Sequence, residues 1–317
     1  MNTPFFVLAP MDDVTDVVFR SIISDCATPD LFFTEFVNVD GLQSRGRNKL
    51  IHKLAINKQT DHNIVAQIWG KTPENYRKTT DEIVEMGFHG VDINMGCPQK
   101  NEVSNGCCSA LINDRGQAGL IIRATQEGAA GRIPVSIKCR LGWNEIDLSW
   151  HEYLLGFNLD MLTIHMRTRK EMSDVPAHWD VLPEIIKLRD KISPKTKIVM
   201  NGDIITRDQG TRLAHAYGAD GIMIGRGIFS DPFCFSENSL WKEMLPAVKV
   251  GLYKTHVERF EQAYLDRQKS FQSLRKFCKT YVHGFDSASE LREKVMSSQS
   301  NQELIKVLDN FIVSGVL

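Results

Sequence analysis

Residues 90–98 join a short apolar run to a loop that holds a cysteine, and they read Gly90-Val91-Asp92-Ile93-Asn94-Met95-Gly96-Cys97-Pro98. The apolar start is typical of a buried strand. Gly96 permits a sharp backbone turn and Pro98 stops the strand, so Cys97 is expected at the strand's carboxyl end. A thiol there can donate a proton, because its pKa is close enough to neutrality to be tuned. The alternative is a small buried residue that only packs.

Seven more runs of the same kind lie before and after residues 90–94, with segments of helical length between them. The eight runs are Phe5–Leu8, Leu31–Thr34, Ile64–Ile68, Gly90–Asn94, Val135–Cys139, Met161–His165, Lys197–Asn201 and Gly221–Gly225. Each predicts a buried parallel strand, because both faces are apolar. The intervening segments favour helices at 73–86, 179–191 and 206–217. Eight strand–helix units predict an α/β fold, a (β/α)8 TIM barrel. A doubly wound open sheet is the alternative.

Polar side chains gather at the carboxyl ends of the runs, where barrel enzymes build their active sites. They are Glu35, Gln67, Asn94, Lys138, His165, Asn201 and Arg226. Gln67, Lys138 and His165 can face the polar edge of a ring, or they can be ordinary surface and capping residues.

Small residues follow the last two runs, as Gly202-Asp203 and at 225–227. Small side chains let backbone N–H groups approach an anion, which predicts a phosphate site in this position. Arg167 and Arg169 stand nearby, just after the sixth run. They can pair with phosphate or stack on a base, or they can form a solvated loop.

The pattern changes after Leu240, because no strand-like run follows. Helical-period segments span 257–279 and 302–313, with a joint at 283–289. We therefore expect a barrel domain over residues 1–240 and a small all-helical domain over residues 241–317.

Charge divides between the two parts. Residues 241–317 carry 12 Lys/Arg and 9 Asp/Glu, whereas residues 1–240 carry 26 and 30. From Arg267 to Lys279 there are five basic residues and no acidic one. This run predicts either a solvated helix face or an electrostatic footprint for a nucleic acid.

Composition is that of an ordinary globular protein and excludes several classes. The 317 residues are 42% hydrophobic and 24% charged, with a formal net charge of −1. These values argue against disorder and against a dedicated polyanion binder. The seven cysteines form no even framework, and Cys107 and Cys108 lack zinc spacing, so we expect no disulfides and no metal. No signal peptide and no apolar run of about 18 residues is present, so we expect a cytoplasmic protein, and a monomer.

Several motifs lie along nearly the whole chain and are specific as a set. They are Ala9-Pro10-Met11-x-x-Val14-Thr15-Asp16-x-x-Phe19-Arg20, Thr34-Glu35, Asp92-x-Asn94-x-Gly96-Cys97-Pro98 followed by Lys100 and Val103, His165-x-Arg167-Thr168-Arg169, Asn201-Gly202-Asp203-Ile204, Gly225-Arg226-Gly227 and Leu274-Arg275-Lys276-x-x-x-x-Tyr281. This set resembles the bacterial-type tRNA-dihydrouridine synthases, flavoenzymes that reduce uridine in tRNA. The resemblance implies an FMN-binding barrel, followed by a helical domain that binds tRNA.

The resemblance also implies a role for each matching residue. Cys97 is expected to be the acid that protonates the uracil ring. The residues expected to hold FMN are Pro10, Met11, Asp12, Gln67, Lys138, His165, Asn201, Gly202, Asp203, Gly225 and Arg226. The residues expected to contact the flipped uridine or the RNA are Asn94, Arg167, Arg169, Arg275 and Lys276. NADPH is the expected electron donor.

Two loops depart from the family pattern. After Pro-Met the family commonly has Ala-Gly, whereas this chain has Asp12 and Asp13. These carboxylates either alter the flavin's potential or point to solvent. Past the catalytic cysteine, a Gly/Ala-rich run is usual, and here Cys107 and Cys108 interrupt it.

Two other functions remain open at this point. A dihydroorotate-type dehydrogenase with FMN would share the barrel and the catalytic cysteine, but it would need no basic helical tail. A non-catalytic tRNA-binding chaperone would keep the fold, but it would not need Cys97, Lys138 and His165. We expect FMN-dependent reduction of a specific tRNA uridine to 5,6-dihydrouridine.

Overall fold

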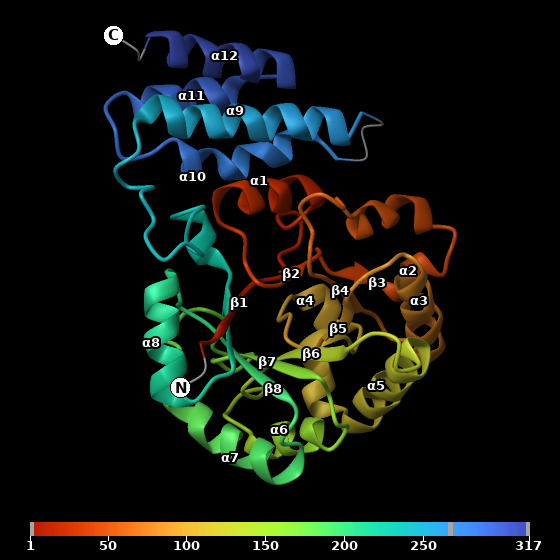
Figure 1. The fold of residues 1–317 in the computed structure, drawn as a ribbon. Helices are drawn as coiled ribbons and strands as arrows, with labels where there is room; N and C mark the ends of the chain where they lie inside the picture. The colour runs from red at the N-terminus through yellow and green to blue at the C-terminus, as the bar shows by residue number, and fades with distance from the viewer. Residues whose placement is uncertain (1–2, 266–268, 315–317) are drawn as a thin grey trace.

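The computed structural model, which describes residues 3–265 and 269–314, contains one sheet of parallel strands (Figure 1). The strands are β1 (Phe5–Leu8), β2 (Phe32–Phe33), β3 (Val37–Asn38), β4 (Ile64–Trp69), β5 (Gly90–Asn94), β6 (Val135–Arg140), β7 (Met161–His165), β8 (Lys197–Asn201) and β9 (Gly221–Ile224). Their order in the sheet is β1-β9-β8-β7-β6-β5-β4-β2, with β3 beside β4.

The sheet closes on itself, which confirms the (β/α)8 barrel and excludes the open sheet. β1 pairs with β9 along its whole length, so the first and last strands are neighbours. On its other side, β1 meets the approach to β2 through a bridge between Val7 and Leu31. The N–H of Leu8 donates to the carbonyl of Leu31 at 3.0 Å. An open sheet would leave two free edges, and this arrangement leaves none.

All eight predicted strands are confirmed, and four of them match at both ends: Phe5–Leu8, Gly90–Asn94, Met161–His165 and Lys197–Asn201. Sequence analysis missed β3, which pairs with the end of β4. Two residues are too few to show a hydrophobic period.

Helices cover the outside of the barrel (Figure 1). Those up to β9 are α1 (Val17–Ala27), α2 (Val39–Leu42), α3 (Pro73–Glu85), α4 (Lys100–Ser104), α5 (Arg115–Ala129), α6 (Leu148–Leu155), α7 (Leu182–Ile192) and α8 (Arg207–Tyr217). The helices expected at 73–86, 179–191 and 206–217 are confirmed as α3, as α7 with the 3-10 turn before it, and as α8. α8 stops at Gly218, whose φ of 83° is the left-handed conformation that glycine adopts at helix ends. No described helix is long and apolar enough to cross a membrane.

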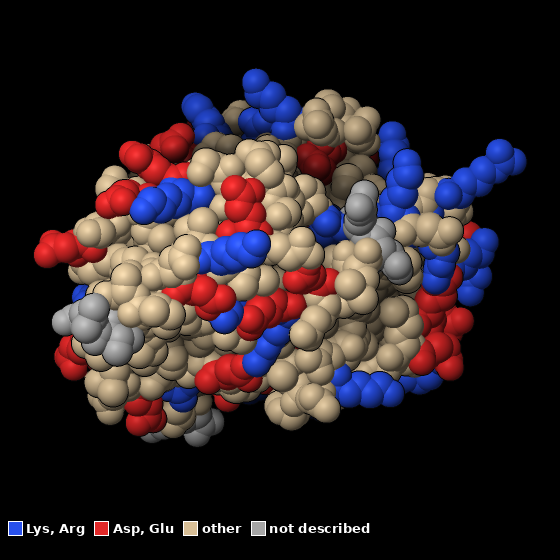
Figure 2. Space-filling view, turned by 90° about the horizontal axis from the view of Figure 1, so that it is seen from above, with Lys and Arg blue, Asp and Glu red and all other residues tan. Residues whose placement is uncertain are grey.

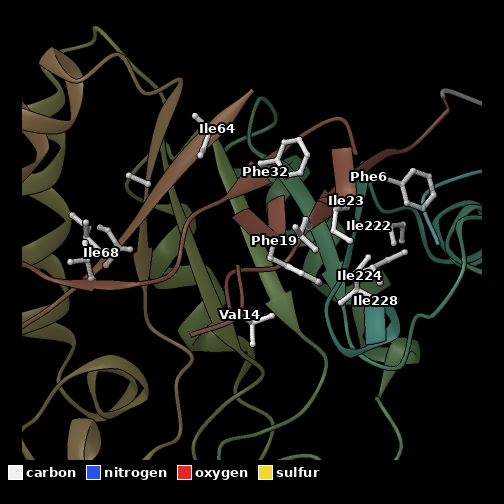
Figure 3. Close-up of a cluster of buried hydrophobic side chains, with 14 of the residues drawn as sticks. Phe6, Val14, Phe19, Ile23, Phe32, Ile64, Ile68, Ile222, Ile224 and Ile228 are labelled. Atoms are coloured by element: carbon white, nitrogen blue, oxygen red, sulfur yellow. The ribbon is translucent and has the colours of Figure 1, made fainter. Parts of the chain in front are cut away.

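Apolar side chains form one layer outside the strands and another inside the barrel. Figure 3 shows part of the outer layer, in which Phe19 and Ile23 of α1 belong to one buried cluster with Ile222 and Ile224 of β9. The inner layer consists of Val7, Ala9, Phe33, Val65, Met161, Val199 and Met223. Side chains alternate along a strand, so Gln67 and Asn201 follow Val65 and Val199 on the inward face. The barrel interior is therefore apolar at its base and polar at the carboxyl ends of the strands.

The chain after β9 forms helices α9 (Pro246–Ala263), α10 (Cys278–Tyr281), α11 (Ala288–Ser297) and α12 (Asn301–Ser314), with the 3-10 helix η6 (Phe271–Phe277) before α10. The helix expected at 302–313 is confirmed as α12. The prediction of one helix over 257–279 is wrong, because α9 ends at Ala263 and a separate 3-10 helix, η6, begins at Phe271. This break lets Lys269 and Lys276 reach carboxylates of the barrel. Arg267, the first residue of the basic run, lies outside the described residues. α11 was missed, since its start falls within the expected joint.

These C-terminal helices pack against α1 beside the barrel (Figure 1). The ring of Phe19 stacks on that of Phe277, with centroids 4.8 Å apart, and meets His256 at 5.7 Å. At the margin, Arg259 pairs with Asp25 at 2.6 Å. The contact therefore has an apolar centre and a charged margin.

Candidate active site

A cavity of about 370 Å³ opens at the carboxyl ends of the strands, on the side of β1 and β6–β9. Nine of the residues expected to hold a cofactor line it: Pro10, Met11, Lys138, His165, Asn201, Gly202, Asp203, Gly225 and Arg226. The rest of the lining is Ala9, Ile204, Ile205, Gly227 and Ser230. Of these, Ile205 and Ser230 belong to no motif, so no local pattern pointed to them. Gln67 and Asp12 lie outside this lining.

Tight turns after β8 and β9 bring the main chain close to the cavity. Gly202 has a φ of 124° and Asp203 a φ of 56°, in the left-handed region that favours glycine. A Cβ placed on Gly227 would lie 2.8 Å from the Cα of Ile205, so no side chain fits there. The small residues after these strands are thus required by the turns themselves.

Two arginines supply positive charge beside these turns. Arg167 is 2% exposed, donates from Nε to the carbonyl of Val175 at 2.5 Å, and pairs with Asp203. Its Nη1 is buried and has no hydrogen-bond partner in the described structure. Arg226 is 64% exposed and lies 3.5 Å from Asp203. Arg226 lines the cavity and would attract an anion there, whereas Arg167 lies outside the lining and contacts it through Asp203.

Lys138 and His165 stand on neighbouring strands and contribute the other polar part of the lining. Burial, together with the nearby charge of Arg140, lowers the pKa of Lys138 to about 8. Burial and the cations around it hold the pKa of His165 well below its ordinary value, so the ring is neutral. The Nδ1 of His165 is buried and has no hydrogen-bond partner among the residues that the structure describes. The pair therefore offers one cation and one unsatisfied ring nitrogen to a polar ligand.

The loop that carries Cys97 is held by hydrogen bonds on both sides. Asn94 Oδ1 accepts from the N–H groups of Gly96 and Cys97, each at 3.0 Å. Arg140 Nε donates to the carbonyl of Gly96 at 2.8 Å. The N–H of Ser109 donates to the carbonyl of Cys97 at 3.3 Å. These contacts fix the thiol, which is partly exposed, at the carboxyl end of β5.

A chain of buried polar side chains continues from Asn94 into the barrel. Asn94 Nδ2 donates to Gln67 Oε1 at 3.0 Å, and Gln67 Nε2 donates to Asp92 Oδ2 at 2.7 Å. Ser136 Oγ donates to the other oxygen of Asp92 at 2.6 Å. Sequence analysis placed Asp92 in the motif around Cys97 without a role and did not identify Ser136, although the period-two alternation places Asp92 and Asn94 on one face of β5. The amides of Gln67 and Asn94 have protein partners here, so their contacts with a cofactor or a base stay predictions.

The acid strength of Cys97 depends on its neighbour Cys108. A hydrogen bond between the two thiols lowers the pKa of Cys97, and burial partly opposes that shift. The same contact and burial raise the pKa of Cys108 well above its ordinary value, so Cys108 stays a neutral thiol. Cys108 has a φ of 55°, which turns the chain at this point. Cys97 is therefore a thiol with strengthened acidity, beside the polar end of the barrel.

The buried carboxyl of Asp92 predicts a pH dependence of stability. Burial raises its pKa to about 6, although hydrogen bonds from Ser136 and Gln67 oppose the rise. The unfolded value is about 3.9, so the stabilisation that Asp92 contributes is complete below about pH 4 and is lost as the pH rises through 6. Relative to Asp92→Asn, the wild type should lose about 2–3 kcal/mol of unfolding free energy between pH 4 and pH 8. Urea denaturation of both proteins at these pH values measures the loss, and a difference that does not change with pH would contradict it.

Two of the predicted residues face away from the cavity. Asp12 forms an ion pair with Lys53. Arg169 places its guanidinium over the ring of Trp143, 4.7 Å from the centroid. Asp12 therefore binds a lysine of the barrel, and Arg169 forms a cation–π contact with a tryptophan.

The two basic residues predicted in the tail lie in η6. Arg275 Nη2 donates to the carbonyl of Ser298 at 2.6 Å, and Lys276 pairs with Asp13. The structure therefore gathers most of the expected cofactor set in one cavity but does not bring Arg275 and Lys276 to it. Within the described ranges, no group of three or more His, Cys, Asp or Glu side chains could hold a metal ion.

The barrel has counterparts among solved structures that are distant in sequence. A 2-naphthoyl-CoA reductase matches with a TM-score of 0.57 and 10% identity, covering 73% of this chain and 49% of that one. Histamine dehydrogenase from Rhizobium sp. 4-9 matches with a TM-score of 0.53 and 12% identity, covering 80% and 48%. At these identities the likeness supports the fold alone.

Sequence comparison is far more specific. The family model "Dihydrouridine synthase" matches residues 7–314. The chain is 44% identical over 311 residues to a "Probable tRNA-dihydrouridine synthase" of Staphylococcus aureus strain Mu50, covering 97% of this chain and 93% of the relative. It is 44% identical over 312 residues to a "Probable tRNA-dihydrouridine synthase 2" of Bacillus subtilis strain 168, covering 97% and 94%. The chain belongs to the dihydrouridine synthase family, a family of flavin-dependent oxidoreductases.

Proposed function

We propose that this tRNA-dihydrouridine synthase binds FMN in the cavity and takes electrons from NADPH. It reduces a specific uridine of tRNA to 5,6-dihydrouridine, with Cys97 as the general acid. The observation that carries the proposal is the family match over residues 7–314, in a chain that retains Cys97, Lys138 and His165 at the barrel mouth. We further expect the protein to act as a monomer in the cytoplasm.

The chemistry of the cavity fits FMN. A phosphate needs donors and little steric obstruction, and the unpaired Nη1 of Arg167, exposed Arg226 and the turn at Gly202 supply both. A flavin ring has polar edges, which suit Lys138 and the unpaired Nδ1 of His165. Arg226, Gly202, Lys138 and His165 belong to the same lining, and Arg167 lies behind it, paired with Asp203.

Cys97 would deliver a proton from its Sγ to C5 of the uracil ring. Bound FMN, in its reduced form, would supply hydride to C6. Hydride addition to the conjugated C5=C6 bond builds negative charge toward C4, so an acid near C5 is required. Cys108 strengthens this acid, and Asn94 holds the loop that aims it. The target base must leave its stack to reach the cavity, at a cost of a few kcal/mol.

We propose that residues 241–317 form a helical domain that binds tRNA, beside a catalytic domain of residues 1–240. The net excess of three positive charges in this part supports the proposal, because phosphate contacts dominate RNA affinity. In Figure 2, Lys and Arg side chains stand among Asp and Glu over the face seen from above, and basic and acidic side chains lie next to one another at its right margin. The family match favours this function over the dihydroorotate-type dehydrogenase and the non-catalytic chaperone.

The direct test uses the purified wild-type protein, NADPH and tRNA made without modifications. We expect a bound chromophore that is released as FMN, and dihydrouridine at one position, detected by mass spectrometry of nuclease fragments. Reactions without NADPH, or with orotate in place of tRNA, should give no product. A flavin-loaded protein that makes no dihydrouridine on any tRNA would refute the proposal.

A further inference from the structure

A buried ionic cluster joins the opening loop of the barrel to the C-terminal helices. Lys269 is only 6% exposed and lies just before η6. Its Nζ donates to Glu35 Oε2 at 2.9 Å and to Asp16 Oδ2 at 3.0 Å, and lies 3.5 Å from Asp13 Oδ1. Although burial opposes the charge, the two buried carboxylates raise the pKa of Lys269. This lysine is therefore a fixed cation at the contact between the two parts of the chain.

Asp13 adds a second link from the same loop. Its side chain pairs with Lys276, whose Nζ also donates to the Asp13 carbonyl at 2.6 Å. Its N–H donates to Glu35 Oε1 at 2.7 Å. Burial opposes the charge of Asp13, yet Lys276 and Lys269 hold its pKa below the ordinary value. Asp13 thus touches both lysines that reach over from the C-terminal helices.

The backbone at Asp13 lies in a conformation that glycine adopts more easily. Its φ is 58°, in the left-handed region, which costs most residues roughly 1–2 kcal/mol, Asp and Asn less, and glycine almost nothing. Glycine would make the same turn more easily. What glycine would lose is the pair with Lys276.

The same turn forms part of the cavity wall. Met11, two residues before Asp13, lines the cavity. Its N–H donates to Thr15 Oγ1 at 3.0 Å, and its carbonyl accepts from the N–H of Val14 at 3.1 Å. Asp13 therefore belongs to a compact turn that borders the cavity, and a displacement of Asp13 would displace that turn.

We propose that Asp13 is a positioning residue: through Lys276 and Lys269 it fixes the C-terminal helices relative to the barrel mouth, and so determines which uridine of a bound RNA reaches the cavity. The inference deepens the proposed function and rests on it for the identity of the substrate. It also gives Lys276 a role within the protein, in place of a contact with RNA phosphate.

The test compares the wild type with Asp13→Gly, which removes the carboxylate while relieving the positive φ, so that misfolding does not account for its effects. We expect the KM for tRNA to rise about fivefold, equivalent to about 1 kcal/mol. We expect kcat and the rate of flavin reduction by NADPH without tRNA to stay within twofold, and dihydrouridine to appear at an additional position. Amide hydrogen exchange should increase in residues 10–16 and 271–281.

Three comparisons separate this role from others. Asp25→Ala breaks a different ion pair between α1 and α9, remote from the loop, and should leave the modified position unchanged. Lys276→Met should raise KM, and combining it with Asp13→Gly should add only the loss of the 3.5 Å contact between Asp13 and Lys269. A lowered KM in Asp13→Gly would overturn the proposal, because it would mean that Asp13 competes with RNA for Lys276. An unchanged KM, position and exchange would overturn it as well.

The hydrogen-exchange measurement needs no substrate. A wild type that modifies no tRNA would refute the proposed function, while exchange in the Asp13→Gly protein would still report whether the link holds the helices. Failure of the function and failure of the link therefore give different results.

Discussion

Cys97→Ala is expected to lower the rate of dihydrouridine formation by at least about 100-fold, the usual contribution of a positioned general acid. The loop should remain in place, because Asn94 and Arg140 bind its backbone and not its thiol. Flavin binding should therefore be unchanged. Single-turnover assays of the reduced protein with tRNA measure the rate, and the flavin absorbance per protein measures loading.

The neighbouring thiol provides a matched control. Cys108→Gly suits the φ of 55° at that position and removes the hydrogen bond that lowers the pKa of Cys97. We expect it to retain turnover, with the limiting pKa in the pH–rate profile moved upward. Cys97→Ala protein that keeps more than a tenth of the wild-type rate would show that another group supplies the proton.

Asp61→Ala is expected to destabilise the protein by about 3–5 kcal/mol, because it leaves a buried guanidinium without its counter-charge. Arg20 and Asp61 have fully buried side chains, joined by two hydrogen bonds of 3.0 and 2.8 Å. Arg20 also donates to the carbonyls of Thr15 and Ala55 at 2.8 and 2.7 Å. Without the carboxylate, Arg20 keeps its two carbonyl contacts but is a buried positive charge with no counter-charge.

Denaturant unfolding of Asp61→Ala and the wild type, at equal flavin occupancy, measures the change. Asp81→Ala is the control, since its partner Arg132 and Asp81 itself are largely exposed, and it should have little effect. Equal effects of the two substitutions would contradict the distinction between a buried and an exposed pair.

The strands were predictable because a parallel barrel strand is apolar on both faces. The run Gly90–Asn94 therefore stands out from its surroundings and was located at both ends. Its polar last residue and the glycine after it also marked the cavity end. By contrast, β3 is too short to show a pattern. The break after Ala263 was not predictable either, because Lys269 binds carboxylates that are far away in the sequence.

Residues within a motif could be proposed for the site from the sequence, whereas the contacts they make with distant partners could not be predicted. Cys97 carries a recognisable context, whereas Asp92 acquires its role from Gln67 and Ser136, 25 and 44 positions away. Lys276 was expected to contact RNA from its charge, yet it pairs with Asp13, 263 positions away. No local pattern reports such a pair.

The pairing of β1 with β9 means that the first strand of the nascent chain is made long before its partner. On the ribosome, residues 5–8 are synthesised about 10–40 s before their partners, residues 221–224, at ordinary elongation rates of about 5–20 residues per second. During this time Phe5, Phe6, Val7 and Leu8 lack the strand that covers one of their edges. An unpaired apolar strand is a template for association with other chains. The first strand is therefore the segment of this barrel that stays open to association with other chains for most of synthesis.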